Sequence, residues 1–252
     1  MSERAYGSAE DATYVVVEER DPVVDYLRFG IALVIITILV SAIYVLVQGV
    51  FDDRAPQTAL ESSISIARSA TEQLPSNGQA WGDYIRLLVV AEEYDKAQEA
   101  IADARENVAD SSLAWVNNAE LRYLIATGRS EEAVEVAPRF VQQDIDWRAE
   151  VANELAQKGV RATAENLPSD STVELWMLKA TAEGDVGDWE SAIDSLTFGL
   201  KYQPNSADLL VLRGNAYLKV GDTDKAREDF ESALEYIPDY APALRGLEEV
   251  QQ

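Results

Sequence analysis

The pattern of apolar and polar residues divides the chain into three stretches. Residues 29–51 form an unbroken run of 23 residues without a charged side chain, while residues 1–28 contain little apolar sequence to bury. As a helix, the run would be roughly 34 Å long at about 1.5 Å per residue, which is enough to cross a hydrocarbon core of about 30 Å. We therefore predict a disordered acidic tail over residues 1–28 and a transmembrane helix over residues 29–51.

Two simpler interpretations of the run are a buried core helix and a cleaved signal peptide. A signal peptide has a shorter apolar stretch close to a basic start, and a core helix is expected to be amphipathic. Arg28 precedes the run, whereas Asp52 and Asp53 follow it. Because basic residues favour the cytoplasmic side, we predict a single-pass cell-membrane protein with a cytoplasmic N-terminus and an extracytoplasmic domain.

Residues 52–252 contain bulky side chains and prolines that return every 34 residues. A period of this length, with two amphipathic helical patterns inside each unit, is typical of stacked helix-turn-helix repeats. The residues in this register are Trp81 and Trp115; Trp176, Leu210 and Leu244; and Pro204 and Pro238.

The clearest unit runs from Ala207 to Tyr240 and resembles a tetratricopeptide repeat (TPR). The resemblance implies an all-α fold, a TPR α-solenoid, behind the single N-terminal transmembrane helix. Three residues depart from the family pattern: Arg213 in this unit and Lys179 and Glu183 in the preceding one. The residues that match are Leu210, Gly214, Tyr217, Ala226, Phe230, Ala233 and Pro238.

The domain boundaries follow from the same spacing. We predict a leading helix and linker over residues 52–77, and a solenoid over residues 78–252 that ends in a capping helix from Ala241 to Val250. Residues 144–170 are expected to form a degenerate repeat, with a helix from Trp147 to Leu155 and a short second helix before Pro168. Pro138 falls inside the preceding second helix, where proline removes a hydrogen bond.

Short signals mark the ends of several predicted helices. Gly187 and Gly221 follow first helices, where glycine accepts the left-handed conformation. Asp188 and Asp222 follow these glycines and are suited to cap the next helices. Ser171 and Glu174 have the spacing of a capping box at the start of the Trp176 helix.

The composition excludes several kinds of chemistry. The chain has no His and no Cys, so it has no imidazole base, thiol nucleophile or zinc–thiolate site. Its formal charge of −24 opposes binding to nucleic acid, which depends on Lys and Arg. We expect no enzyme activity, no cofactor, no metal and no small-molecule substrate. The acidity serves solubility in the first interpretation and attracts a basic partner in the second.

First helices line the concave surface of such a solenoid, and partners bind there. The side chains beside the core stripe are mostly apolar or acidic, which suits an amphipathic helix or an extended, partly basic segment of a protein partner. For any one of these residues, the alternative is a solvated face without a partner. The predicted groove residues are Arg86, Val89, Glu120, Tyr123, Met177, Thr181, Val211, Asn215, Leu218 and Lys219.

The order of tail, membrane span and repeats is similar to that of the ancillary TPR subunit of the bacterial Sec translocon. That resemblance implies a chaperone-type adaptor or scaffold for emerging proteins. The alternative is the TPR subunit of cytochrome c maturation, which holds the apocytochrome. A third interpretation is a structural adaptor in an envelope complex.

Overall fold

The computed structural model describes residues 58–164, 167 and 170–251. The predicted tail (1–28) and membrane span (29–51) lie outside these residues. Within the described ranges, every helix is too short or too polar to cross a bilayer. All of the described residues belong to one compact unit.

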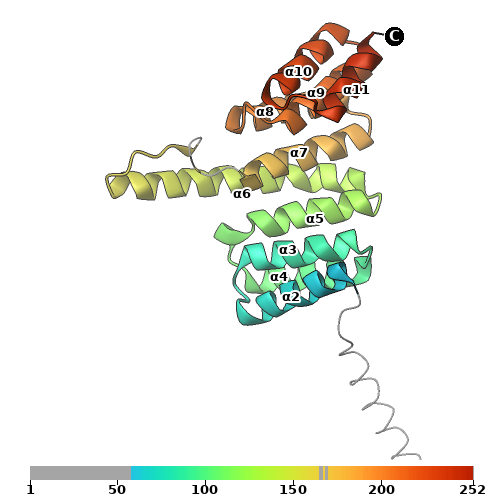
Figure 1. Ribbon diagram of the computed structural model, residues 1–252. Helices are drawn as coiled ribbons and strands as arrows, with labels where there is room; N and C mark the ends of the chain where they lie inside the picture. Colours follow the sequence, from blue (N-terminus) through green and yellow to red (C-terminus); the bar gives the residue numbers. More distant parts are fainter. Residues whose placement is uncertain (1–57, 165–166, 168–169, 252) are drawn as a thin grey trace, which may run out of the picture. The chain divides into compact units, whose positions relative to one another are not determined.

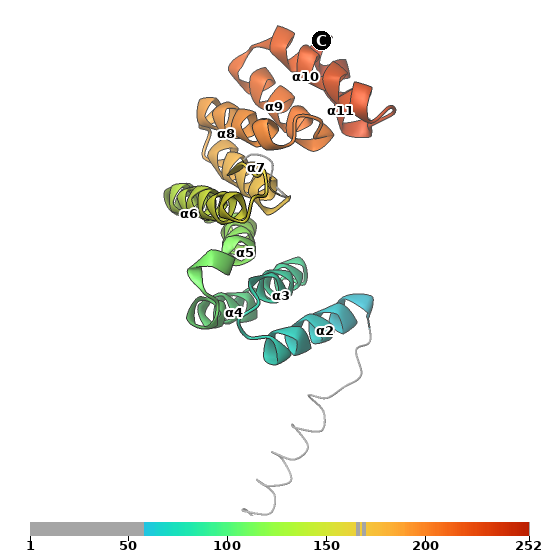
Figure 2. The ribbon, with the colours of Figure 1, turned by 90° about the vertical axis from the view of Figure 1, so that its left-hand side faces the viewer.

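The described part of the chain is entirely helical, without a β-strand, which confirms the all-α prediction. Figures 1 and 2 show the helices following one another in chain order. The α-helices are α2 (Ala59–Gln73), α3 (Gly78–Val90), α4 (Tyr94–Asn107), α5 (Ala114–Ala126), α6 (Ser130–Gln157), α7 (Asp170–Asp185), α8 (Trp189–Tyr202), α9 (Ala207–Val220), α10 (Thr223–Tyr236) and α11 (Ala241–Val250). A short 3-10 helix, η1 (Asp110–Ser112), precedes α5.

Pairs of antiparallel helices stack in sequence. Helix α3 packs on α5, and α5 packs on α7, so these first helices of successive units lie side by side. The second helices join neighbouring units: α8 contacts both α7 and α9, while α10 contacts both α9 and α11. Helices α2 and α11 cover the two ends of this stack, at the places where the sequence pattern put a leading and a capping helix.

Two turns between paired helices confirm the predicted glycine and cap signals. Gly187 and Gly221 have φ angles of 85° and 82°, in the left-handed region that favours glycine. The side chain of Asp188 accepts a hydrogen bond from the Ser191 backbone N–H at 3.1 Å. Asp222 accepts one in the same way from Lys225, at 3.3 Å. Side-chain hydrogen bonds from Ser191 and Lys225, and next these backbone bonds, lower the pKa of both aspartates below the ordinary value.

The apolar core is divided into two clusters that meet at α7. The first contains buried side chains from Trp81 in α3 to Ala182 in α7. The second contains those from Val173 in α7 to Ala243 in α11. Helix α7 therefore contributes one part of its surface to each cluster.

The aromatic ring of Phe230 shows why small residues recur in the units. The ring is fully buried between α9 and α11. A Cβ atom at Gly214 would lie 2.6 Å from it, and one at Gly246 would lie 2.4 Å from it. Glycine at both positions lets the two helices approach the ring.

The residues that depart from the family pattern form polar contacts inside the stack. Arg213 donates two hydrogen bonds to the Asp229 carboxylate, at 2.7 and 2.9 Å, and one to Thr197 at 3.1 Å. One repeat earlier, Lys179 pairs with Glu183 and donates to Ser195 at 2.8 Å. Each unusual charge is thus matched by a second polar residue in the same interior layer.

Helix α6 differs from the predicted degenerate repeat. It is one continuous helix of 28 residues that runs through Pro138, and the expected helix from Trp147 to Leu155 is its second half. The described residues between 158 and 169 form no α-helix, so the prediction of a short second helix before Pro168 is wrong. The buried side of this helix runs without a break at helical spacing, at Ala133, Ala137, Phe140, Val141, Asp144, Arg148 and Ala152.

Arg148 contacts the segment where the second helix was predicted. Its side chain is 0% exposed. The guanidinium donates to the backbone carbonyls of Ala164 and Leu167, both at 2.9 Å, and to the hydroxyl of Thr172 at 3.0 Å. The buried Arg148 side chain therefore ties α6 to Ala164 and Leu167 and to the first turn of α7.

Candidate functional site

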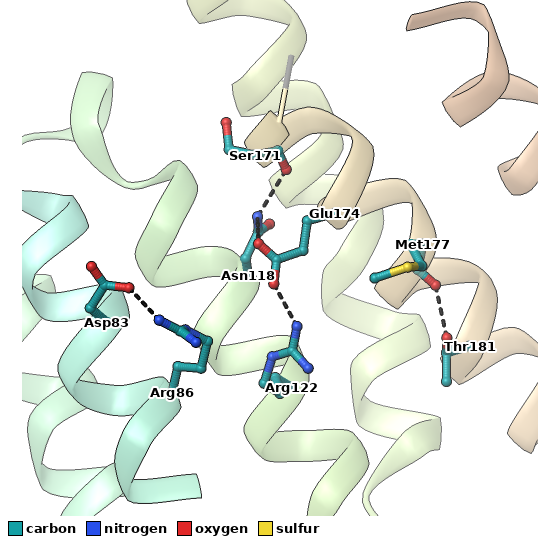
Figure 3. Close-up of polar contacts among 8 residues, drawn as sticks. All are labelled: Asp83, Arg86, Asn118, Arg122, Ser171, Glu174, Met177 and Thr181. Atoms are coloured by element: carbon teal, nitrogen blue, oxygen red, sulfur yellow. Dashed lines mark hydrogen bonds and ion pairs between the residues drawn. The ribbon is translucent and has the colours of Figure 1, made fainter. Parts of the chain in front are cut away.

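Polar contacts join α5 and α7, the first helices of neighbouring units. In Figure 3, Arg122 of α5 reaches Glu174 of α7 at 2.6 Å. Asn118 donates to the backbone carbonyl of Ser171 at 2.8 Å. Because α7 begins at Asp170 and Glu174 bonds to α5, the predicted capping box of Ser171 and Glu174 is wrong. On α3, Arg86 pairs with Asp83 at 2.7 Å.

A pocket of about 250 Å³ opens between α7 and α9 and is closed below by α8. Its apolar side chains come from all three helices and form the floor. Polar side chains from the two first helices stand at the rim. The lining residues are Ala180, Thr181, Gly184, Asp185, Trp189, Ala192, Leu196, Leu212, Asn215, Ala216 and Lys219.

Three polar groups at the rim offer different interactions. The exposed amide of Asn215 makes no hydrogen bond to the described residues, so both its donor and its acceptor are available. The ammonium of Lys219 lies 5.9 Å from the centre of the Trp189 ring. Asp185 accepts a hydrogen bond from Ser130 of α6 at 2.7 Å and keeps further acceptor capacity.

The structure brings three of the predicted groove residues, Thr181, Asn215 and Lys219, into this one pocket. Met177 and Leu218 are half-buried and pack against the second core cluster. These five residues lie on α7 and α9, which are the two first helices that border the pocket.

Two other predicted residues lie elsewhere on the stack. Glu120 forms an ion pair with Arg105 of α4. Arg86 borders a separate, shallower groove between α2 and α3. Neither residue lines the pocket between α7 and α9.

Val89, Tyr123 and Val211 do not line an open groove. Their side chains are only 6%, 7% and 6% exposed, and they belong to the apolar core. Tyr123 packs edge-on against the ring of Tyr94 from α4. Each first helix therefore has more of its surface buried than the single apolar stripe in its sequence, because other helices pack on it from both sides.

Trp189 is a pocket residue that the sequence pattern did not indicate. It is the first residue of α8, and its ring covers Gly184 of α7, where a Cβ atom would lie 2.7 Å from the ring. The sequence did contain a signal for this contact, namely a glycine near the end of one helix and a tryptophan at the start of the next.

Comparison with known proteins agrees with the helical-repeat fold. Residues 207–240 match the tetratricopeptide repeat model, and they are the unit that the spacing identified. Among solved structures, the chain is similar to BtubC (BKLC) from P. vanneervenii, with a TM-score of 0.56, 16% identity, and coverage of 77% of this chain and 84% of that one. At this identity the similarity shows the fold alone, and that fold is a TPR α-solenoid.

Two further solved structures are more distant. The second TPR domain of human RPAP3, in complex with an HSP70 peptide, has 18% identity and a TM-score of 0.42, over 54% of this chain and 92% of that one. The TPR2AB domain of yeast Sti1, in complex with HSP90, has 18% identity and a TM-score of 0.33, over 76% of each chain. The comparison with curated proteins gives no match.

Proposed function

We propose that the protein is a non-catalytic scaffold that binds an extended segment of a partner protein in the pocket between α7 and α9. The observation that carries the proposal is the combination of an apolar floor with rim groups that are available for bonding, Asn215 and Lys219. A pocket of about 250 Å³ has room for one large apolar side chain. Concave surfaces of helical repeats bind partners in this way.

The rim supports a specific mode of binding. The Asn215 amide can donate to one peptide carbonyl and accept from one peptide N–H. The Lys219 ammonium can donate to a second carbonyl, and the Asp185 carboxylate can pair with a basic side chain. The formal charge of −24 favours the approach of a partly basic segment.

A photoreactive amino acid at position 215 tests this proposal in intact membranes. We expect one defined partner to be crosslinked from position 215 and from position 181, but not from position 231 on the exposed surface of α10. Filling the pocket with Thr181→Trp should abolish crosslinking from position 215, whereas Glu231→Trp should leave it unchanged. Equal crosslinking in both variants would contradict binding in the pocket.

We also propose that residues 29–51 anchor the scaffold in the membrane, with the repeats outside the cytoplasm. The length and apolar character of this segment support the proposal. The natural chain has no cysteine, so single cysteines can report the topology without background. A membrane-impermeant maleimide should label Glu231→Cys in intact cells and Ser8→Cys only after lysis. The reverse pattern would invert the orientation, and labelling of both in intact cells would contradict a single span.

The proposed role at the membrane is that of an adaptor for emerging proteins at the Sec translocon. The alternatives are an apocytochrome holder and a structural adaptor in an envelope complex, and all three rest on the order of tail, span and repeats. The partner crosslinked from position 215 distinguishes them. Nascent chains support the first, apocytochromes support the second, and one fixed subunit supports the third.

A further inference from the structure

The second half of α6 forms an arm that stands out from the stack of helices. In Figure 1, α6 extends well beyond the ends of its neighbours α5 and α7. The chain turns at Gly159, whose φ angle is 78°, and comes back to α6 at Ala164, which accepts a hydrogen bond from Arg148. We define the arm as residues 146–164. Most of its side chains are exposed, so the described part of the chain leaves this surface uncovered.

The charges of the arm are divided along its length. Four exposed charged residues are spaced four apart, so they form a row along one side of the helix, opposite the buried side chains of Arg148 and Ala152. The row has three acidic residues toward the base of the arm and one basic residue toward its tip: Asp146, Glu150, Glu154 and Lys158. Arg161 adds a second positive charge beyond the turn, and residues 155–164 contain no acidic residue. The tip is therefore basic in a chain whose formal charge is −24.

These charges are poorly matched within one copy of the chain. Lys158 lies 4.0 Å from Glu154, and both side chains are exposed, so this ion pair contributes little. Within the described ranges, Asp146, Glu150 and Arg161 form no ion pair. Charges at both ends of the arm are thus available to a partner.

We propose that the arm is the interface of a two-fold symmetric dimer, in which the arms of two copies of this chain lie antiparallel. In this arrangement, the basic tip of each arm meets the acidic base of the other. Arg161 lies opposite Trp147 of the second copy. In the same register, Lys158 lies opposite Glu150 of the second copy. Because of the two-fold symmetry, each of these contacts forms twice.

The base of the arm has a place for the tip. Trp147 and Trp115 line a groove of about 320 Å³, and both indole rings are half-buried. The described residues that line this groove include no basic side chain that would repel an arginine. The guanidinium of Arg161 can stack on the exposed part of an indole ring, which is the aromatic group that binds cations best.

The charge pattern selects both the direction of the arms and the partner. The two-fold axis passes near Glu154, which is midway between Trp147 and Arg161 in the sequence. The two Glu154 carboxylates repel each other there, and Lys158 of the same chain offsets this repulsion. A parallel pair of arms would instead bring every acidic residue against its own counterpart. The antiparallel arrangement makes the surface complementary to itself, so its partner is a second copy.

The test uses the full-length protein in detergent micelles and native mass spectrometry, which separates monomer from dimer. The tip variant combines Lys158→Glu with Arg161→Glu. The base variant combines Asp146→Lys with Glu150→Lys. We expect each variant alone to dimerise more weakly than the natural protein by about tenfold or more, because tip and base then carry charges of the same sign.

A mixture of the two variants is the decisive measurement. The reversed tip of one copy then meets the reversed base of the other, and the natural base of the first meets the natural tip of the second. We expect a heterodimer with an affinity close to that of the natural dimer. The matched control combines Arg227→Glu with Arg245→Glu, which make the same change in charge on exposed residues of α10 and α11. It should dimerise like the natural protein.

Single cysteines test the register, because the natural chain contains no cysteine. Glu154→Cys should form a disulfide between two copies under mild oxidation, since the two residues meet near the axis. Asp146→Cys should not, because its counterpart lies about 24 Å along the arm at about 1.5 Å per residue, which is too far for a disulfide.

Three results would overturn the proposal. They are a natural protein that stays monomeric at every concentration measured, a dimer that persists in the tip and base variants, and a mixture of these variants that gives no heterodimer. A persistent dimer would show association through another face. None of these results affects the proposal for the pocket between α7 and α9, because no substituted residue lines that pocket.

Discussion

At the scale of single residues, the spacing between helices depends on side chains that have no room to move. The Phe230 ring lies between Gly214 and Gly246, so it cannot retreat from one glycine without approaching the other. We expect Gly214→Ala to destabilise the protein by about 1–3 kcal/mol through overpacking, despite the better helix propensity of alanine. Urea unfolding followed by far-ultraviolet circular dichroism, which reports on all the helices, measures this change.

The matched control for that variant is Glu231→Ala, which changes an exposed residue on α10. Its effect should stay within about 0.5 kcal/mol. If Gly214→Ala were as stable as this control, the close contact with Phe230 would not limit the approach of the helices.

Arg148 is the second residue whose loss has a defined consequence. Arg148→Met leaves the carbonyls of Ala164 and Leu167 without their donor and removes the positive charge beside Asp144. We expect a loss of about 3–5 kcal/mol, because a buried charge and buried acceptors lose their partner. Limited proteolysis should also cut the chain between residues 158 and 169 sooner. Arg139→Met, at an exposed position of the same helix, should leave both properties unchanged.

At the scale of helices, polar pairs inside the stack join α9 to its neighbours. Arg213→Leu removes the charge that departs from the family pattern, but it leaves the Asp229 carboxylate buried without its partner. We expect this variant to lose about 3 kcal/mol or more. The double variant Arg213→Leu with Asp229→Ala should regain most of the loss, since no unpaired charge remains.

A double-mutant cycle on thermal unfolding measures this coupling. If the two single variants and the double variant gave simply additive losses, the pair would not act as a unit. That result would favour a purely steric role for Arg213.

The helix caps predict a pH dependence. The pKa values of Asp188 and Asp222 are lowered in the folded protein, chiefly by the hydrogen bonds to Ser191 and Lys225. Because the pKa values in the folded protein lie below the ordinary pKa of 3.8, the ionised caps stabilise the fold at pH values above 3.8. This contribution is lost as the pH falls through the folded values. Asp222→Ala should therefore lower the melting temperature at neutral pH, and the difference from the natural protein should shrink at pH values below 3.8. A constant difference at all pH values would contradict an ionised cap.

The helix pattern was predictable where each unit carries its own turn, as at Gly187 and Gly221. It failed at α6, because the same apolar spacing fits one long helix and two short ones. What decides between them is the buried guanidinium of Arg148, which bonds to carbonyls 16 and 19 residues further along the chain. Contacts of this range are not visible in a local periodic pattern.

At the scale of the whole repeat domain, two core clusters meet at α7. Because units in a stack interact mainly with their neighbours, damage to one cluster should remain local. We expect Gly214→Ala to accelerate hydrogen exchange in α9, α10 and α11 more than in α3, α4 and α5. Exchange measured by mass spectrometry on peptic fragments tests this expectation. A uniform acceleration would show that the two clusters unfold together.

The candidate site was only partly predictable at this scale. The spacing indicated Thr181, Asn215 and Lys219, and the structure places all three in one pocket between α7 and α9. It could not separate them from Val89 and Tyr123, because the burial of these side chains depends on how closely the neighbouring helices approach. The sequence alone gives the direction of a side chain around its helix, whereas the stack determines which directions face solvent.

The polar pairs between helices also affect how further repeats could be added to the stack. Arg213 bonds to Thr197, and the position 34 residues after Thr197 holds Glu231. If the segment 207–240 were duplicated in tandem, Glu231 of the first copy would stand where the arginine of the second copy needs an acceptor. The segment thus already carries a complementary carboxylate for a successor of its own kind, and gene duplication could lengthen the array without a compensating mutation at this junction.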